Sequence, residues 1–376
     1  MTRRSVPTRS GPRRSVHFQI ADIRFFPSDT ANDIETRLSK ALSELRRKNL
    51  GIDEDWFSNL DRGGEWSDVT DQISPSRKDR DKIRRRAQKL VELRQQASRM
   101  SHLSYDERKK LSALQNGVQL IQLESEHRVD EIAAALHEEM PWMSSATEFA
   151  WYAMRESMRK GAPALRLPPL LLDGPPGIGK SHWARRLAEL IGTPTELIDA
   201  SNEPAGFAVA GSQRGWSTAH PGRPVELILH QRVGNPVIVI DEVDKCGDVR
   251  SSRGFSFALS NALLPLLDPL SARTWSCPFF RVRFDMRWIS WILTSNDRLA
   301  VPAPLQSRCR VVYIPPLAGA HLAYFARREG AARGLPADTV DALTDMLRGA
   351  ERGWDLRAVI KLIDTLVAHE NRPPLQ

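Results

Sequence analysis

The octapeptide GPPGIGKS at residues 174–181 constrains this chain more than any other feature, because it fits the pattern G-x-x-x-x-G-K-[ST]. The apolar run Leu170–Leu172 precedes it, and an amphipathic pattern from Trp183 to Ile191 follows it. A glycine-rich loop between a strand and a helix turns its backbone N–H groups inward around phosphate oxygens, and the positive end of the helix adds to the attraction. We therefore expect a phosphate-binding loop in an α/β domain, the alternative being a glycine-rich turn that matches by chance.

This loop and a second apolar strand predict a site for ATP and Mg²⁺. Lys180 would neutralise the β/γ-phosphates, and the Ser181 hydroxyl would ligate Mg²⁺. The run Val237–Ile240 ends in Asp241, expected to hold Mg²⁺ through water, and in Glu242, expected to be the general base for hydrolysis. A solvated acidic turn is the alternative for this pair. The nucleotide contacts are expected from Gly174, Pro175, Pro176, Gly177, Ile178, Gly179, Lys180, Ser181 and Asp241.

Three further residues are candidates for catalysis. Asn296 follows the apolar run 288–295 and would orient the attacking water or the γ-phosphate, unless it only forms a turn. Arg308 lies on the next turn and would project into the nucleotide site of a neighbouring subunit; Arg310 competes for this role, and a surface ion pair is the alternative. Arg357 opens a C-terminal helix and would fold onto the phosphates, unless it is only a solvated side chain.

Composition narrows the class of protein. The chain has 376 residues, 41% of them hydrophobic and 27% charged, which excludes collagen-like, fully disordered and disulfide-scaffold proteins. No apolar run approaches the roughly 18 residues that a membrane span needs, so we expect no membrane partner. Three scattered cysteines, Cys246, Cys277 and Cys309, fit a reducing compartment, and the expected location is the cytoplasm.

The N-terminal part is expected to be mainly helical. Residues 16–75 form a small region with a short strand near its start and a helix at 32–49. Within residues 76–140, the helical patterns at 77–100 and 105–140 predict a coiled-coil-like antiparallel hairpin, with apolar residues recurring every seven positions in the first of them.

Two basic segments lie in this N-terminal part. Residues 1–15 contain no acid and are expected to be a disordered basic arm, although a mitochondrial transit peptide has a similar composition. The run 77–89 holds eight Lys or Arg and two Asp. The net charge of +8 permits an anionic partner. Nucleic-acid binding is therefore possible at both segments, against the alternative of solvated charges.

Beyond residue 140 short apolar runs alternate with helical patterns, which is typical of a parallel α/β sheet. We expect this α/β subdomain at 141–315 and a helical subdomain at 316–376. The expected strands are Pro168–Asp173, Glu196–Ala200, Val237–Asp241, Trp288–Ser295 and Val311–Ile314.

Four segments resemble the ATPase part of Lon-type proteases, within the AAA+ ATPases. Residues 235–245 are similar to that family's N-P-hhhh-D-E-h-D-K, and residues 263–269 to its L-L-x-x-L-D-P. Residues 294–308 resemble its T-S-N…P-A-P-L-x-x-R, and residues 211–222 match the spacing of its pore segment. The resemblance covers roughly residues 141–370. It implies a five-stranded parallel sheet with a C-terminal helical lid, and a homo-oligomeric ring of six subunits with nucleotide sites between them.

The same resemblance implies that loops in the pore thread a protein substrate. Trp216 stands where the family has Tyr, and Ser217 stands where it has an aliphatic residue; residues 246–256 are a candidate second pore loop. After Gln376 there is no room for the Lon protease domain, so we expect an ATPase without its own peptidase, which a separate peptidase could join. The alternatives are a nucleic-acid-associated loader or initiator, and an assembly switch that does not thread.

Overall fold

The computed structural model describes residues 16–52, 70–201, 205–215, 218–245, 259–349 and 353–371. The chain forms two compact units. The first contains the residues up to Ala21 and those from Ala113 onwards, and the second contains Asp22–Ser112. The expected basic arm at 1–15 and the candidate pore loop at 246–256 lie outside the described residues.

The first unit is built on a sheet of five parallel strands, which confirms the predicted fold class. In spatial order the strands are β4 (Thr195–Asp199), β5 (Val237–Asp241), β8 (Ser290–Ser295), β3 (Leu170–Asp173) and β9 (Arg310–Tyr313). All six residues of β8 are buried, and so are Val237–Ile240 of β5. Because these central strands are covered on both faces, they appear in the sequence as continuous apolar runs.

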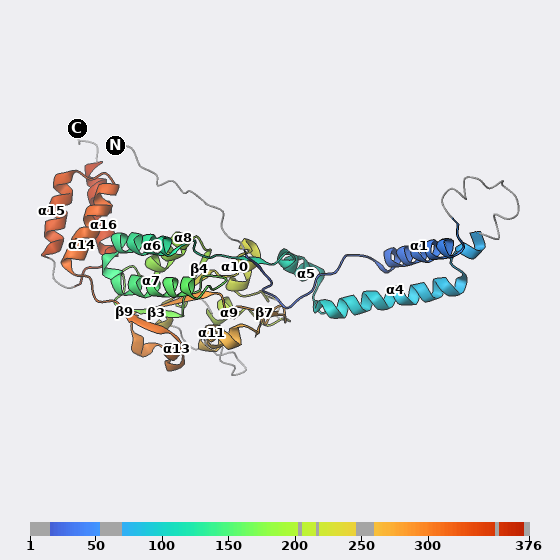
Figure 1. The fold of residues 1–376 in the computed structure, drawn as a ribbon. Coiled ribbons are helices and arrows are strands. Elements are labelled where there is room, and N and C mark those ends of the chain that lie inside the picture. The colour runs from blue at the N-terminus through green and yellow to red at the C-terminus, as the bar shows by residue number, and fades with distance from the viewer. Residues whose placement is uncertain are drawn as a thin grey trace, which may run out of the picture. The chain divides into compact units, whose positions relative to one another are not determined.

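Helices surround this sheet and join it to a small C-terminal lid (Figure 1). The helices of the sheet domain are α6 (Glu126–Glu139), α7 (Ser144–Arg159), α8 (Lys180–Ile191), α9 (Ala205–Ala210), α10 (Arg223–Gln231), α11 (Leu259–Leu267), α12 (Pro269–Ala272) and α13 (Ala303–Arg308). A hairpin of β6 (Trp275–Ser276) and β7 (Arg283–Phe284) precedes β8. The lid consists of α14 (Gly319–Ala332), α15 (Ala337–Arg348) and α16 (Leu356–Glu370), with α14 packed against both of its neighbours.

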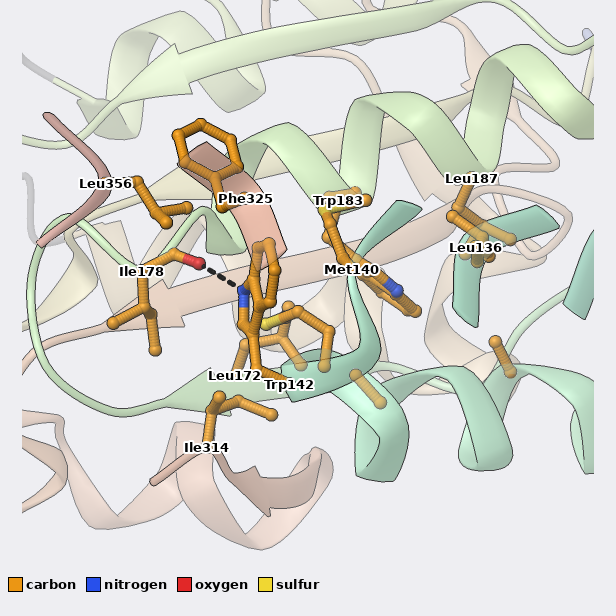
Figure 2. Packing of buried hydrophobic residues seen from close by; sticks show 14 of the residues in the cluster. Leu136, Met140, Trp142, Leu172, Ile178, Trp183, Leu187, Ile314, Phe325 and Leu356 are labelled. Carbon is orange, nitrogen blue, oxygen red and sulfur yellow. Dashed lines mark hydrogen bonds between the residues drawn. The ribbon is translucent and has the colours of Figure 1, made fainter. Parts of the chain in front are cut away.

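One hydrophobic cluster runs from α6 through the sheet to the lid. Trp183 of α8 is fully buried in it and donates from Nε1 to Thr147 Oγ1 at 3.0 Å. Trp142 lies between Ile178 and Phe325, and its Nε1 donates to the Ile178 carbonyl at 2.9 Å (Figure 2). The phosphate-loop segment is therefore held from behind by an indole that also contacts the lid.

Buried Asn235, just before β5, connects three segments of the first unit. Its side chain accepts from the Ile121 amide at 2.8 Å and donates to the Ile121 carbonyl at 2.8 Å and the Leu165 carbonyl at 2.9 Å. A buried amide that satisfies three backbone groups is costly to replace, since each lost partner leaves an unpaired polar group. Asn235 thus positions the entry to the strand that carries Asp241 and Glu242.

The residues at the start of the described chain belong to the same unit as the sheet. Strand β1 (Val16–Phe18) pairs antiparallel with β2 (Val118–Leu120), and the Ile20 carbonyl accepts from the Asp285 amide at 2.7 Å. The second unit is therefore an excursion of the chain between β1 and β2. The expected boundaries at residues 76 and 140 differ from this division, because the pairing of β1 with β2 joins segments far apart in sequence.

The second unit contains α1 (Ala31–Asn49), α4 (Arg77–Ser98) and α5 (Tyr105–Leu111). Capping boxes at Thr30 and Ser76 begin the two longer helices. These helices lie side by side and antiparallel (Figure 1), and an ion pair of 2.7 Å joins Arg46 at the end of α1 to Asp79 at the start of α4.

The expected hairpin between 77–100 and 105–140 is therefore wrong, because α4 pairs with α1 instead. The stretch 105–140 is divided into α5, strand β2 and α6. Gly117, with φ +74°, ends the first helical part, and the Ser125 side chain caps the start of α6. Among the described helices, none combines the length and apolar character needed to cross a lipid bilayer.

Candidate active site

The predicted phosphate loop connects β3 to α8 at the carboxyl edge of the sheet. Gly177 and Gly179 have φ of +74° and +94°, a region that side chains disfavour. A Cβ on Gly177 would also lie 2.2 Å from Oδ2 of Asp355, which belongs to the start of the lid helix α16. Glycine at this position therefore permits both the turn of the loop and the close approach of the lid.

Lys180 is buried, and its ammonium makes three hydrogen bonds. Nζ donates to the carbonyls of Gly174 at 2.6 Å and Pro175 at 2.9 Å, and to Asn296 Oδ1 at 2.9 Å. Burial lowers the pKa of Lys180, while nearby carboxylates such as Asp241 oppose that shift. The acceptors hold the cation at the mouth of the loop, where phosphate oxygens would be its natural partners.

Ser181 and Asp241 meet as the sequence predicts. Ser181 Oγ donates to Asp241 Oδ1 at 2.7 Å, and Thr294 Oγ1 donates to the same carboxylate oxygen. A hydroxyl and a carboxylate beside a phosphate loop are the hard oxygen ligands that Mg²⁺ takes together with nucleotide phosphates and water. The donor set therefore fits Mg²⁺.

Glu242 is the first residue after β5 and has a φ of +56°, an uncommon conformation for a non-glycine residue. Its amide donates to Thr294 Oγ1 at 3.1 Å, and its Oε2 pairs with Lys245 Nζ at 2.8 Å. This hydrogen bond with Glu242 raises the pKa of Lys245. Thr294 and Lys245 were not predicted as site residues, although both lie in motifs that carry the family resemblance.

Asn296 connects the lysine of the loop to the predicted base. Its Oδ1 accepts from Lys180, and its Nδ2 donates to Glu242 Oε1 at 3.3 Å. The Asn296 amide donates to Asp244 Oδ1 at 3.2 Å, which fixes the backbone of this residue beside the end of β5. The two ends of one amide side chain thus contact a cation and a carboxylate with complementary roles.

A cavity of about 410 Å³ lies between the phosphate loop and the lid. Lys180, Ser181, Asp241, Glu242 and Asn296 line it from the sheet side. The lid contributes Phe325, Arg328, Glu329, Leu356, Arg357 and Ile360. Arg357 is therefore at the cavity, as its predicted role requires. Arg328 and Glu329 were missed, because nothing in the local sequence of α14 distinguishes them from solvated charges.

Arg308 and Arg310 do not line this cavity. Both are exposed, and Arg308 donates a long hydrogen bond of 3.4 Å to the Pro304 carbonyl of its own helix α13. Trp216 and Ser217, expected in the pore, lie outside the described residues. A second cavity of about 460 Å³ opens at Thr195, at the amino end of β4, and contains none of the predicted site residues.

Comparison with known proteins agrees with this geometry. Residues 170–317 match the model of the ATPase family associated with various cellular activities (AAA). The Lon protease of Desulfovibrio desulfuricans is 34% identical over 160 residues, which is 42% of this chain and 18% of that protein. The Lon protease of Methylocella silvestris is 28% identical over 222 residues, covering 57% of this chain and 27% of that protein. The peroxisomal Lon protease homolog 2 of Oryza sativa is 31% identical over 160 residues, or 42% of this chain and 17% of that protein.

These matches, with the fold and the site, define the sheet region as an AAA ATPase domain, and they support ATP hydrolysis as its activity. More particularly, it is related to the ATPase modules of Lon proteases. The similarity covers the AAA region, and the chain spans only about a sixth to a quarter of the length of these relatives.

Proposed function

We propose that this chain is an ATP-hydrolysing motor that unfolds or remodels a protein substrate and works as a closed ring of six identical subunits. The observation that supports it best is the connected set Lys180–Asn296–Glu242, next to the Ser181–Asp241 pair and enclosed by the lid. The residues to which we assign phosphate binding, metal binding and base catalysis thus line one cavity.

We assign the residues of the cavity the following roles in ATP hydrolysis. Lys180 and the loop amides bind the phosphates, and Ser181 and Asp241 hold Mg²⁺, which supplies charge neutralisation at the transferring phosphoryl group. Glu242 accepts the proton of the attacking water, and Asn296 orients that water. Before this step Glu242 must leave Lys245, because an oxygen paired with an ammonium is a poorer base.

The lid can transmit the effect of ATP hydrolysis to the rest of the protein. The start of α16 is hydrogen-bonded to the phosphate loop, and Arg357 of the same helix lines the cavity. A change in what occupies the cavity therefore acts directly on a helical subdomain. We infer that lid motion is the mechanical output of the motor.

A ring explains the position of Arg308. A finger arginine must reach a transition state, yet Arg308 is exposed and lies away from the cavity of its own subunit. Both facts are met if Arg308 enters the nucleotide site of the neighbouring subunit. Such contacts run head to tail, and a series of them that closes on itself forms a ring.

The substrate is proposed to be a protein chain that Trp216 and Ser217 contact in the pore. The support is the spacing of residues 211–222 and the relatives named Lon protease. A peptidase on a separate chain is the corresponding partner. The free thiols Cys277 and Cys309 favour a reducing compartment, for which we propose the cytoplasm.

Electron microscopy of the Glu242→Gln protein with ATP tests this function. The variant keeps ATP bound, so a six-membered ring with density for an extended chain in its pore is expected when an unfolded protein such as casein is added. A monomer or open dimer that has bound ATP would overturn the ring, and a ring that never holds the polypeptide would overturn threading.

A further inference from the structure

Helix α4 of the second unit carries a stripe of four basic side chains. Lys78, Lys82, Arg85 and Lys89 follow one another at spacings of four, three and four residues. At 100° per residue they fall within an arc of roughly 60°, and at 1.5 Å per residue they extend over about 16 Å. We call these four residues the α4 basic stripe.

The stripe lies opposite the face that packs on α1. Ile83 and Ala87 are the buried residues of α4, with exposed fractions of 8% and 0%. Half a turn separates this face from the four basic positions, all of which are exposed. The packing of the hairpin therefore forces the stripe outward, and the capping box at Ser76 secures the helix just before it.

Among the residues that the structure describes, no acidic side chain neutralises the stripe. In the described part of the chain, none of its three lysines forms an ion pair, and Arg85 donates only to the Asp81 carbonyl of its own helix, at 3.3 Å. The neighbouring basic residue Arg84 of α4 behaves differently, because its Nε lies 3.9 Å from Oε2 of Glu35 in α1. Helix α4 has nine basic and three acidic residues, so a local excess of positive charge remains on the outer face.

We propose that the α4 basic stripe binds the phosphate backbone of a nucleic acid without reading its sequence. A row of cations one helical turn apart complements a polymer with regularly repeated anions, and Lys and Arg contacts to phosphate are the main source of such binding. No apolar or aromatic residue interrupts the stripe, so it lacks the buried anchor that a protein interface needs and the apolar face that a membrane surface needs. The AAA match at residues 170–317 does not include α4.

The test is fluorescence anisotropy of the full chain with a fluorescein-labelled DNA duplex of about 24 base pairs, titrated at several KCl concentrations. The wild type should bind with a steep salt dependence. The variant K78A/K82A/R85A/K89A should lower the slope of log K against log[salt] by about three to four, at about 0.9 per lost phosphate contact, and bind about 10²–10³-fold more weakly near 0.1 M salt. Alanine keeps the helix intact.

A matched control removes the same number of charges from the same unit, away from the stripe. Lys40, Lys48, Lys109 and Lys110 are exposed, and K40A/K48A/K109A/K110A should bind within about a factor of three of wild type. Both variants should keep wild-type basal ATPase and circular dichroism. Equal losses in the two variants would overturn the stripe in favour of non-specific net charge.

Three further outcomes would also overturn the proposal. The first is wild-type protein that does not bind the duplex at about 0.1 M salt, and the second is a stripe variant with an unchanged salt slope. The third is wild type that binds polyglutamate or anionic phosphatidylserine vesicles much more tightly than DNA, which would assign the stripe to an acidic protein or a lipid surface. Because basal ATPase is measured separately, failure of this proposal leaves the proposed motor function untouched.

Discussion

The backbone amide of Leu356 donates a hydrogen bond of 3.1 Å to the carbonyl of Gly177, which ties the first residue of lid helix α16 to the phosphate loop. The neighbouring Asp355 caps the same helix by accepting from the Ala358 amide at 2.7 Å. Loop conformation and lid position are therefore linked by direct contact, without an intervening element.

Gly177→Ala should disrupt this contact. The new methyl group would collide with the Asp355 carboxylate. The alanine would also have to adopt the φ of +74° that Gly177 has, which side chains disfavour. We expect at least about tenfold weaker binding of a fluorescent ATP analogue, since a change of only about 1.4 kcal/mol suffices. Gly334→Ala is the matched control, because Gly334 has φ of +78° with nothing within 4 Å of its Cβ position. Equal effects of the two variants would show that backbone strain alone, and not the lid contact, governs binding.

Lys180→Ala should abolish both nucleotide binding and turnover. Lys180 is the buried cation of the phosphate loop, and its loss leaves the carbonyls of Gly174 and Pro175 and the Asn296 amide without their donor. Isothermal titration with ATP and a phosphate-release assay would measure the two effects. The exposed Lys160→Ala should behave as wild type, and binding by Lys180→Ala at wild-type affinity would contradict the site.

Glu242→Gln should retain ATP and hydrolyse it about 10²–10⁴-fold more slowly, because glutamine preserves the shape of the side chain but accepts no proton. Single-turnover hydrolysis separates this effect from binding. A rate near that of wild type would assign the base to another residue of the cavity.

Arg308→Ala should bind ATP normally and lose hydrolysis by about 10³-fold or more if it completes a neighbouring site. Mixing it with Lys180→Ala subunits should restore some activity, because sites that combine an intact Lys180 with an intact Arg308 then form. A mixture of Lys180→Ala with Glu242→Gln is the control, since every site keeps one internal defect. Absence of recovery in confirmed mixed assemblies would favour a surface role for Arg308.

Glu126→Gln should lower the melting temperature in a pH-dependent way. Hydrogen bonds from Arg159 and Arg155 lower the pKa of Glu126 from 4.5 to about 2. A carboxylate with a depressed pKa stabilises the fold above its ordinary pKa and loses that contribution as pH falls towards the folded value. The melting difference from wild type should thus be full at pH 7 and shrink below pH 4.5. The exposed Glu124→Gln should show no such trend, and a constant difference for Glu126→Gln would contradict the ion pair.

The sequence by itself determined the five-stranded parallel sheet, and it selected the residues of the phosphate loop, Asp241, Glu242 and Asn296 as site candidates. These features are readable because each is local: a continuous apolar run buries a strand on both faces, and its carboxyl end places the next polar residues at one edge of the sheet. The apolar strand before residues 174–181 and the helix after them are also local features, and together they identified the phosphate loop.

Only the tertiary structure decided which distant segments meet. It paired α4 with α1, placed β1 beside β2, and brought Arg328 to the cavity. The sequence pattern of α4 fits either helical partner, because an apolar face specifies that it must be buried but not which surface will bury it. The contact of Leu356 with Gly177 could not be predicted from the sequence either, because a backbone hydrogen bond does not depend on which side chains the two residues carry.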